Sequence, residues 1–166
     1  MAELVLLKSS VRNVDCGRNV RIVEPSNVYE CRLGDDCFIG PFVEIQRGAS
    51  IGPRTKVQSH TFVCELVTIG ADCFIGHGVM FVNDDFAIGG PANGRRELWR
   101  STEVGDHVSI GSNATILPVR ICSQVVIGAG AVVTGDIDRP GIYAGNPARM
   151  LRPLPAERGP QESNAR

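Results

Sequence analysis

The chain has 166 residues, a length that suits one domain with a hydrophobic core and hardly two. Its 17 basic and 18 acidic residues leave a net charge of −1, which argues against a strongly basic protein that binds nucleic acid. Val and Ile together supply 32 residues, Leu supplies nine, and Gly supplies 19. Because β-branched residues and glycines favour strands and tight turns, this composition argues against a helical bundle.

The sequence shows no segment typical of export or of membrane insertion. Residues 4–7 are apolar, but this run is shorter than the core of a signal peptide, and Glu3 precedes it. No apolar run approaches the roughly 18 residues that a membrane helix needs. We therefore expect a soluble cytoplasmic protein with no membrane partner.

A six-residue repeat runs along the chain. After a weaker start at residues 16–28, large apolar residues occupy nine consecutive positions that are spaced six apart. A small or β-branched residue follows each of the first eight by four positions, and a Gly often follows directly. The repeat resumes after residue 103 and continues to residue 133. The large track is Leu33, Ile39, Ile45, Ile51, Val57, Val63, Ile69, Ile75 and Phe81, and the small track is Cys37, Val43, Ala49, Thr55, Thr61, Val67, Cys73 and Val79.

This period predicts an all-β fold of stacked triangular coils. Six residues fit neither the turn of an α-helix nor the two-residue alternation of a flat strand. Each hexad is therefore one short strand and a turn, and three hexads, or 18 residues, make one coil. Such coils stack as parallel strands that bury both tracks, which gives a parallel β-helix. We expect this domain over residues 1–152, an inserted loop at residues 84–103, and a disordered tail at residues 153–166.

The six cysteines do not have the spacing of a metal site. None of them forms a Cys-x-x-Cys pair, so we expect no zinc. Cys37 and Cys73 fall on the small track, which predicts that they fill the core.

The C-terminal coils resemble a known family. Residues 109–118 (SIGSNATILP), 127–137 (IGAGAVVTGDI) and 144–149 (AGNPAR) are similar to the hexapeptide-repeat acyltransferases. The resemblance implies a left-handed parallel β-helix built of hexapeptide repeats, the use of acetyl-CoA, and a homotrimer with sites between subunits. One position departs from the family, because Cys122 occupies a corner where the family usually has Gly, a residue that adopts unusual φ angles freely.

A narrower resemblance indicates a substrate class. Residues 43–46 (VEIQ), 59–65 (SHTFVCE) and 74–84 (FIGHGVMFVND) are similar to a branch of that family that acetylates amino groups of nucleotide-linked sugars. Its substrates are UDP- or dTDP-linked amino sugars, such as UDP-2-acetamido-3-amino-2,3-dideoxy-glucuronate, and its products enter surface polysaccharides. The segment after Asp84 departs from the branch pattern, so the identity of the sugar stays open. The resemblance implies that the substrate meets Glu44, Gln46, His60 and Glu65.

Acetyl transfer to an amine needs a group that accepts the proton that the nitrogen loses. His77 lies at an outward position of its hexad, and an imidazole suits this role near neutral pH. The resemblance places Asn83 and Asp84 against the sugar, where Asp84 accepts an N–H and Asn83 both donates and accepts. His60 lies 17 residues before His77, which is nearly one coil, so both belong to one edge. The alternative for either histidine is an inert position on the coil surface.

The insertion carries Arg95, Arg96, Trp99 and Arg100. Long loops on rigid scaffolds often carry function. Guanidinium groups pair with diphosphates and carboxylates, so Arg95 and Arg96 are candidate ligands of the nucleotide sugar. Trp99, the only Trp, is expected to anchor the loop against a coil or a neighbouring subunit. The alternative for the arginines is a solvated polar loop.

Acetyl-CoA is expected along the C-terminal coils. Gly111, Gly128 and Ala129 are small enough to let pantetheine approach the backbone. Pro147 ends the repeat, so its segment also has a capping role that is compatible with binding. By the resemblance, the adenine and phosphate end of CoA meets Asn146, Pro147 and Arg149.

Three other interpretations stay open. An O-acetyltransferase would act on a sugar or serine hydroxyl. A carbonic anhydrase of the same fold needs three histidines on zinc, whereas this chain has only His60, His77 and His107 and lacks the His-x4-His pair of that class. A non-catalytic β-helix protein would need neither the insertion nor the Asn-Asp pair.

Overall fold

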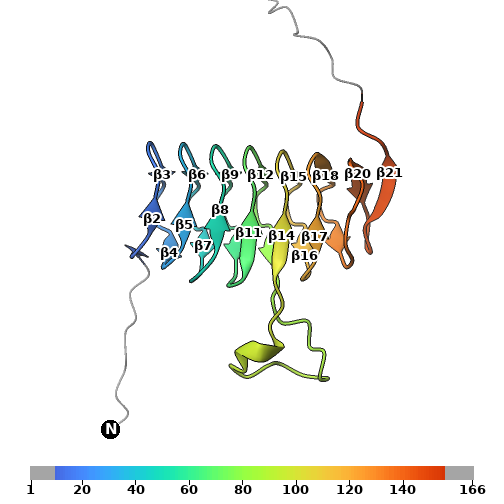
Figure 1. Ribbon diagram of the computed structural model, residues 1–166, viewed down its shortest axis with the longest axis horizontal. Coiled ribbons are helices and arrows are strands. Elements are labelled where there is room, and N and C mark those ends of the chain that lie inside the picture. The colour runs from blue at the N-terminus through green and yellow to red at the C-terminus, as the bar shows by residue number, and fades with distance from the viewer. Residues whose placement is uncertain (1–9, 156–166) are drawn as a thin grey trace, which may run out of the picture.

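The fold is a triangular prism of stacked coils (Figure 1). The computed structural model describes residues 10–155, so residues 1–9 and most of the predicted tail lie outside the described part. Strands of two to four residues alternate with turns and form three sheets. Sheet A contains β1 (Val11–Arg12), β4 (Asn27–Tyr29), β7 (Glu44–Ile45), β10 (Phe62–Val63), β13 (Met80–Phe81), β16 (Thr115–Ile116) and β19 (Val132–Val133). Sheet B contains β2 (Asp15–Cys16), β5 (Arg32–Leu33), β8 (Ser50–Ile51), β11 (Val67–Ile69), β14 (Thr102–Val104) and β17 (Arg120–Ile121). Sheet C contains β3 (Arg21–Ile22), β6 (Phe38–Ile39), β9 (Lys56–Val57), β12 (Phe74–Ile75), β15 (Ser109–Ile110), β18 (Val125–Ile127), β20 (Gly141–Ala144) and β21 (Arg149–Arg152).

Up to β20, consecutive strands lie in different sheets, and each strand up to β16 pairs with the strand three places later along the chain. In sheet C, for example, Phe38 of β6 pairs with Lys56 of β9. The described pairings are parallel except that of β20 with β21, which closes the C-terminal end of sheet C. This is the predicted left-handed parallel β-helix with three strands per coil.

The two tracks of the repeat fill the interior of the prism. Each large-track residue from Leu33 to Phe81 is at most 1% exposed, and each small-track residue from Cys37 to Val79 is at most 2% exposed. Burying an aliphatic side chain stabilises a fold by about 1.5–3 kcal/mol, and here every coil buries such residues against its neighbours. The predicted core is therefore confirmed.

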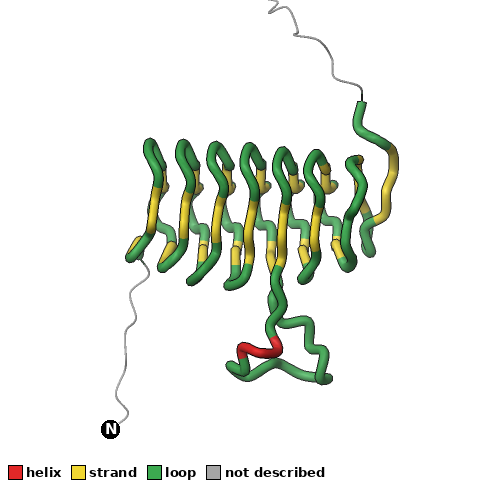
Figure 2. The backbone as a smooth tube through the Cα atoms, viewed as in Figure 1, coloured by secondary structure: helices red, strands yellow, loops and turns green. Residues whose placement is uncertain are grey.

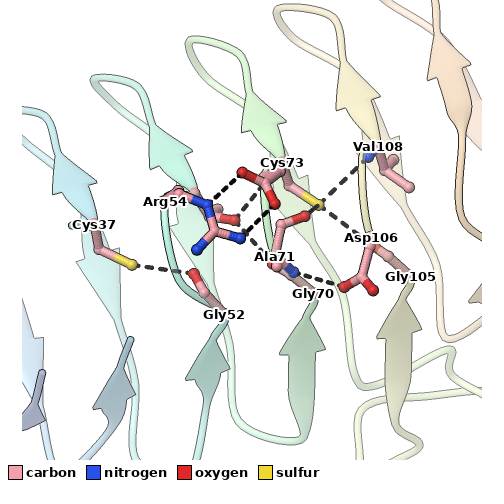
Figure 3. Close-up of polar contacts among 11 residues, drawn as sticks. Cys37, Gly52, Arg54, Gly70, Ala71, Cys73, Gly105, Asp106 and Val108 are labelled. Carbon is pink, nitrogen blue, oxygen red and sulfur yellow. Dashed lines mark hydrogen bonds and ion pairs between the residues drawn. The ribbon is translucent and has the colours of Figure 1, made fainter. Parts of the chain in front are cut away.

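Buried thiols and hydroxyls join successive coils near the corner between sheets B and C (Figure 3). Each donates a hydrogen bond to the carbonyl oxygen of a corner glycine in the next coil. Thr55 Oγ1 also accepts the buried backbone N–H of Cys73 at 3.0 Å. The cysteines of the small track thus fill the core, as predicted, and also link the coils. The donor–acceptor pairs are Cys37 Sγ to Gly52 O at 3.1 Å, Thr55 Oγ1 to Gly70 O at 2.8 Å, and Cys73 Sγ to Gly105 O at 3.2 Å.

All six cysteines are free. Burial raises the pKa of Cys31 to about 11 and the pKa of Cys64 to about 12. Because a thiol reacts as its thiolate, burial disfavours the reactive form of these two groups. Cys16 is exposed on the first coil.

Corner glycines are needed where successive coils approach closely. A Cβ on Gly52 would lie 2.5 Å from the carbonyl carbon of Gly70 in the next coil. Gly52 does not have a positive φ, so the close approach explains the glycine, and not the unusual backbone angle expected above. Cys122 follows β17, the last strand of sheet B, beyond which a single bridge between Ile121 and Ile137 continues the stack. Residues 137–141 still stack on this corner, since the backbone N–H of Cys122 donates to the carbonyl oxygen of Ile137 at 2.8 Å, so the side chain of Cys122 does not break the contact between the coils.

The inserted loop leaves the prism at the corner between sheets A and B (Figure 2). It follows β13 and ends at β14, where Thr102 pairs with Val67 of β11. The predicted insertion at residues 84–103 is two residues too long, because its last two residues already belong to β14. The loop contains η1 (Arg96–Leu98), and no helix within residues 10–155 is long and apolar enough to cross a membrane.

Candidate active site

The turns of successive coils stack into three edges of the prism, and two of these edges carry the predicted site residues. The histidine edge, between sheets C and A, consists of residues 41–42, 59–60, 77–78, 112–113 and 129–130. The loop edge, between sheets A and B, consists of residues 46–48, 64–66, 82–101 and 117–119.

His60 and His77 lie in consecutive coils of the histidine edge, as their 17-residue spacing predicts. The backbone N–H of Gly78 donates to the carbonyl oxygen of Ser59 at 2.9 Å, which holds the two coils in register. Ser59 Oγ lies 2.8 Å from Nδ1 of His77. His60 has a left-handed φ of 64° and stacks on Phe42, with 4.9 Å between the ring centroids. Both histidines are exposed.

Glu65 connects the inserted loop to the prism on the loop edge. Its carboxylate forms an ion pair with Arg96 of η1. Its backbone carbonyl oxygen accepts a hydrogen bond from Asn83 Nδ2 at 3.2 Å. The carbonyl oxygen of Asn83 in turn accepts the backbone N–H of Arg100 at 2.9 Å, where the loop returns. The predicted residues Glu65, Asn83 and Arg96 are therefore neighbours.

Asp84 holds the inserted loop in shape. Its Oδ1 accepts the backbone N–H of Phe86 at 3.1 Å, and its Oδ2 accepts the backbone N–H of Ala92 at 2.7 Å. Ala92 is only 1% exposed, so the second bond closes a buried point of the loop. Each carboxylate oxygen has two lone pairs, and one on each remains for a substrate N–H. The structure thus gives Asp84 a structural contact in addition to the predicted catalytic one.

Asp85 is a further residue of the site region, next to Asp84 at the base of the loop. Its Oδ2 forms an ion pair with Arg100 Nη1 at 2.9 Å across the base of the loop. Its Oδ1 is buried and has no hydrogen-bond partner within residues 10–155. No motif marks this residue in the sequence, where it is simply the second of two adjacent aspartates.

The remaining loop residues make contacts of their own. Arg95 is exposed, and its Nε donates to the carbonyl oxygen of Ala92 at 3.3 Å. The guanidinium of Arg96 lies 5.6 Å from the ring centroid of Trp99. Trp99 is half-buried and borders a groove that Val119 also lines, so it lies beside a coil, one of the two expected positions. The side chain of Arg96 is 53% exposed and accessible to an anionic ligand.

Glu44 lies on strand β7, and Gln46 follows this strand at the start of the loop edge. Gln46 Nε2 donates to Glu44 Oε1 at 2.9 Å. Tyr29, in the preceding coil, is half-buried beside them, and the Arg12 guanidinium lies 4.2 Å from its ring centroid. Burial, and to a lesser extent the charge of Glu44, raise the pKa of the Tyr29 phenol. Tyr29 was not predicted, although the register of the repeat places it directly below Gln46.

The predicted residues form two groups instead of one. His60 and His77 form a group on the histidine edge, whereas Glu65, Asn83 and Arg96 form a group on the loop edge. β13 lies between His77 and Asn83 in the same coil. Within one chain the groups therefore border opposite sides of the outward face of sheet A.

The residues expected along acetyl-CoA continue the histidine edge in the C-terminal coils. The carbonyl oxygen of His77 accepts the N–H of Asn113 in the next coil at 2.8 Å. A Cβ on Gly111 would lie 2.4 Å from the backbone nitrogen of Ala129, so Gly111 also serves coil stacking. A Cβ on Gly128 would lie 2.9 Å from Ala144 Cβ. Ala129 itself is exposed.

Residues 145–148 form the turn between β20 and β21, and Arg149 is the first residue of β21. The N–H of Ala148 donates to the carbonyl oxygen of Val132 at 2.8 Å, and the carbonyl oxygen of Gly145 accepts the N–H of Val132 at 3.0 Å. The turn therefore covers the last strand of sheet A, which is the capping role expected for this segment. The predicted residues of this segment are all exposed: Asn146, Pro147 and Arg149.

The third histidine lies apart from the other two. The N–H of His107 donates to the carbonyl oxygen of Ala71 at 2.9 Å on the edge between sheets B and C. Within the described residues, no group of three or more His, Cys, Asp or Glu side chains is arranged to hold a metal ion.

Two repeat families match this sequence. Residues 30–65 match the bacterial transferase hexapeptide (six repeats), and residues 102–135 match the hexapeptide repeat of succinyl-transferase. The chain belongs to the hexapeptide-repeat acyltransferase superfamily. Among curated proteins, the bifunctional protein GlmU of Limosilactobacillus fermentum is 35% identical over 111 residues, which are 66% of this chain and 22% of GlmU. This member of the superfamily thus spans about a fifth of that relative's length.

Solved structures of other proteins share the fold. PerB from Caulobacter crescentus, in complex with CoA and GDP-perosamine, is 23% identical to this chain, with a TM-score of 0.67. The match covers 79% of this chain and 56% of PerB. A galactoside acetyltransferase in complex with coenzyme A is 29% identical, with a TM-score of 0.63 over 73% of this chain and 64% of that one. Because one fold hosts many functions, the shared fold alone does not determine the activity of this member.

Proposed function

We propose that this chain is an acetyl-CoA-dependent N-acetyltransferase that acetylates an amino group of a nucleotide-linked sugar for a surface polysaccharide. The observation that carries the proposal is the position of the exposed His77 on the edge that continues, over the next two coils, into Gly111 and Ala129. One edge thus offers a proton acceptor beside a surface of small residues. The likeness to PerB, whose structure contains CoA and GDP-perosamine, supports both ligands. A cytoplasmic location, where both are expected, is part of the proposal.

The C-terminal part of the histidine edge suits a slender chain such as pantetheine. Ala129 is exposed, and a Cβ built on Gly130 would meet no atom within 4 Å. The turn at residues 145–148 lies further along, and the exposed Arg149 that follows it can bind a phosphate. Bound acetyl-CoA would supply a thioester acetyl group with a good leaving group.

The residues of the chain supply proton transfer and orientation. His77 accepts the proton of the amine at Nε2, the ring nitrogen that does not contact Ser59. Asn83 Oδ1, which accepts no hydrogen bond within the described part, and the free lone pairs of Asp84 accept the N–H groups that orient the amine. Arg95 and Arg96 bind the anionic part of the nucleotide sugar. The other groups proposed to contact it are Glu44, Gln46, His60, Glu65 and Trp99.

The separation of the two groups calls for a second subunit. We therefore include in the proposal the homotrimer that the family resemblance implies, with the histidine edge of one subunit facing the loop edge of the next. Exposed apolar side chains at the relevant places support such contacts. Phe86 and Ile88 on the loop are 58% and 53% exposed, and Met80 on sheet A is 42% exposed.

The test is a screen of 3-amino and 4-amino nucleotide sugars with acetyl-CoA, in which release of the free thiol is followed. We expect thiol release that depends on the amino sugar, with equal formation of the N-acetyl product by mass spectrometry. His77→Ala should lower the rate by about 100-fold or more. His107→Ala is the matched control, because His107 lies on the third edge and should leave the rate unchanged. Absence of turnover with every amino sugar would contradict the proposal.

An O-acetyltransferase is the second candidate. The likeness to the galactoside acetyltransferase, the higher in identity of the two structures compared above, favours it. A hydroxyl is a weaker nucleophile than a neutral amine and has to lose its proton as it attacks, so this reaction depends more strongly on His77. Thiol release with nucleotide sugars that carry hydroxyls but no amine would select this candidate.

A further inference from the structure

The contact between Ser59 and His77 connects two consecutive coils at the histidine edge. Ser59 Oγ lies 2.8 Å from His77 Nδ1, and this is the only hydrogen bond of the His77 ring within residues 10–155. The backbone bond between Gly78 N–H and the Ser59 carbonyl oxygen, at 2.9 Å, fixes the register that places the hydroxyl below the ring. The serine is therefore held under the imidazole by the stacking of the coils.

We propose that Ser59 is a positioning residue, which accepts a hydrogen bond from Nδ1–H of His77 and so leaves Nε2 as the proton acceptor. A neutral imidazole carries one hydrogen, and the partner of one nitrogen decides which nitrogen holds it. If the serine hydroxyl donated to Nδ1 instead, Nε2 would carry the hydrogen and be unable to accept a proton. The catalytic consequence rests on the proposed function, whereas the tautomer does not.

A hydrogen bond from His77 Nδ1–H to Ser59 Oγ also suits the protonated form of the imidazole. After His77 has taken up a proton, both ring nitrogens are donors, and Ser59 must accept from Nδ1–H. When Ser59 already accepts in the neutral state, no group has to turn during the reaction, which is the condition for a preorganised site. The exposed edge lets the serine hydroxyl donate to water.

Among the neighbours of His77 in the described part of the chain, only Ser59 makes a hydrogen bond to the imidazole. The ring of His60 is stacked on Phe42 in the coil below. Above His77, the side-chain oxygen of Asn113 lies beside Gly78, where a Cβ would approach it to 2.4 Å. Neither makes a hydrogen bond to the imidazole in the part of the chain that the structure describes.

Ser112 provides a matched control. It stands in the same column as Ser59, but in the coil above His77, because Asn113 N–H donates to the His77 carbonyl oxygen. No hydrogen bond joins its hydroxyl to the imidazole among the described residues. Ser59→Ala and Ser112→Ala therefore remove the same group from the two sides of the ring.

The first measurement is the tautomer of His77 by ¹⁵N NMR, at a pH at which the imidazole is neutral. The chain has only three histidines, and His77→Ala assigns the signal. We expect the Nδ1–H tautomer in the wild type, in Ser59→Thr and in Ser112→Ala, and a shift toward Nε2–H in Ser59→Ala. An Nε2–H tautomer in the wild type, or a Ser59→Ala spectrum equal to that of the wild type, overturns the proposal.

The second measurement is steady-state acetylation of the amino sugar. Ser59→Ala should lower kcat by about 2- to 10-fold, the effect of one lost hydrogen bond, with KM unchanged, and Ser59→Thr should restore it. If kcat of Ser59→Ala equals that of the wild type, the positioning role is overturned, whether or not KM changes. The expected tautomers without any turnover would support the contact and contradict only the proposed function.

Discussion

Replacing Asp84 by Ala should release the inserted loop from its folded shape. The carboxylate accepts the backbone N–H groups of Phe86 at 3.1 Å and Ala92 at 2.7 Å, and so closes the first part of the loop onto the residue at its base. Alanine offers no acceptor. Both N–H groups must then find water, and Ala92, which is 1% exposed, has to move outward to do so.

The size of the effect follows from these two bonds. A hydrogen bond to a charged acceptor contributes about 1.5 kcal/mol at the low end of its range, the value that suits a partly exposed carboxylate. Two such bonds amount to about 3 kcal/mol, or about a 100-fold larger population of the open loop. The core of the prism does not include the loop, so global unfolding should change little.

Hydrogen exchange at the Ala92 amide measures this opening directly. We expect about a 100-fold faster exchange in Asp84→Ala and about a 10-fold faster exchange in Asp84→Asn, which keeps one acceptor oxygen. Asp106→Ala is the matched control, because Asp106 accepts the backbone N–H of Ala71 at 2.7 Å on a different edge. Exchange at Ala92 in Asp84→Ala that equals the wild-type rate would refute the reasoning.

Three further predictions concern the prism itself. Thr55→Val should lower the free energy of unfolding by about 2 kcal/mol in chemical denaturation, because both hydrogen bonds of the hydroxyl are lost in the core, whereas Thr55→Ser should keep them. A thiol reagent at pH 8 should label Cys16 within the folded protein, and label Cys64, whose pKa burial raises to about 12, only after unfolding. The hydrogen bonds from Arg54 lower the pKa of Asp72, so this carboxylate stabilises the fold above the ordinary pKa of Asp, about 3.9, and the contribution is lost as the pH falls through the lowered pKa. Arg54→Ala should therefore flatten the acid limb of a stability-against-pH curve.

The repeat alone is sufficient to predict the fold because one physical condition applies to every coil. A large residue and a small residue must face inward in each hexad, and the sequence from Leu33 to Phe81 meets the first condition nine times and the second eight times. Errors arose where the repeat is interrupted. The end of the insertion was placed two residues late, since Thr102 pairs with Val67 before the first large residue of the new run, Val104.

The corner at Cys122 shows a different kind of limit. A glycine at a corner indicates either an unusual φ or a close approach, and the sequence does not distinguish between them. The structure does so, because a Cβ on Gly52 would lie 2.5 Å from the carbonyl carbon of Gly70, whereas Cys122 follows the last strand of sheet B. This departure from the family pattern does not disturb the coil, because the N–H of Cys122 still donates to the carbonyl oxygen of Ile137 at 2.8 Å.

The sequence predicts which site residues share an edge, but not which side chains make contact. Spacing by one coil predicts which residues share an edge, and it correctly pairs His60 with His77. The contact of His77 with Ser59 needs the side-chain geometry, and so does the ion pair between Glu65 and Arg96, which are separated by an irregular loop. Asn83 is only six residues from His77, but one strand of the triangular coil lies between them, so the two residues belong to different edges.

The glycines of the repeat explain why the insertion lies at the loop edge. After the strands of sheet B the chain has Gly34, Gly52, Gly70 and Gly105, and after most strands of sheet C it also has glycine, because the coils nearly touch there. After the strands of sheet A it has side chains instead, such as Gln46, Cys64 and Val82. A loop that leaves from this corner breaks no close contact between coils, and the neighbouring positions are free to carry polar side chains. In every third hexad the large residue has no glycine after it, as at Ile45, Val63 and Phe81. This pattern is visible in the sequence, and it marks the edge that carries the inserted loop and the polar side chains.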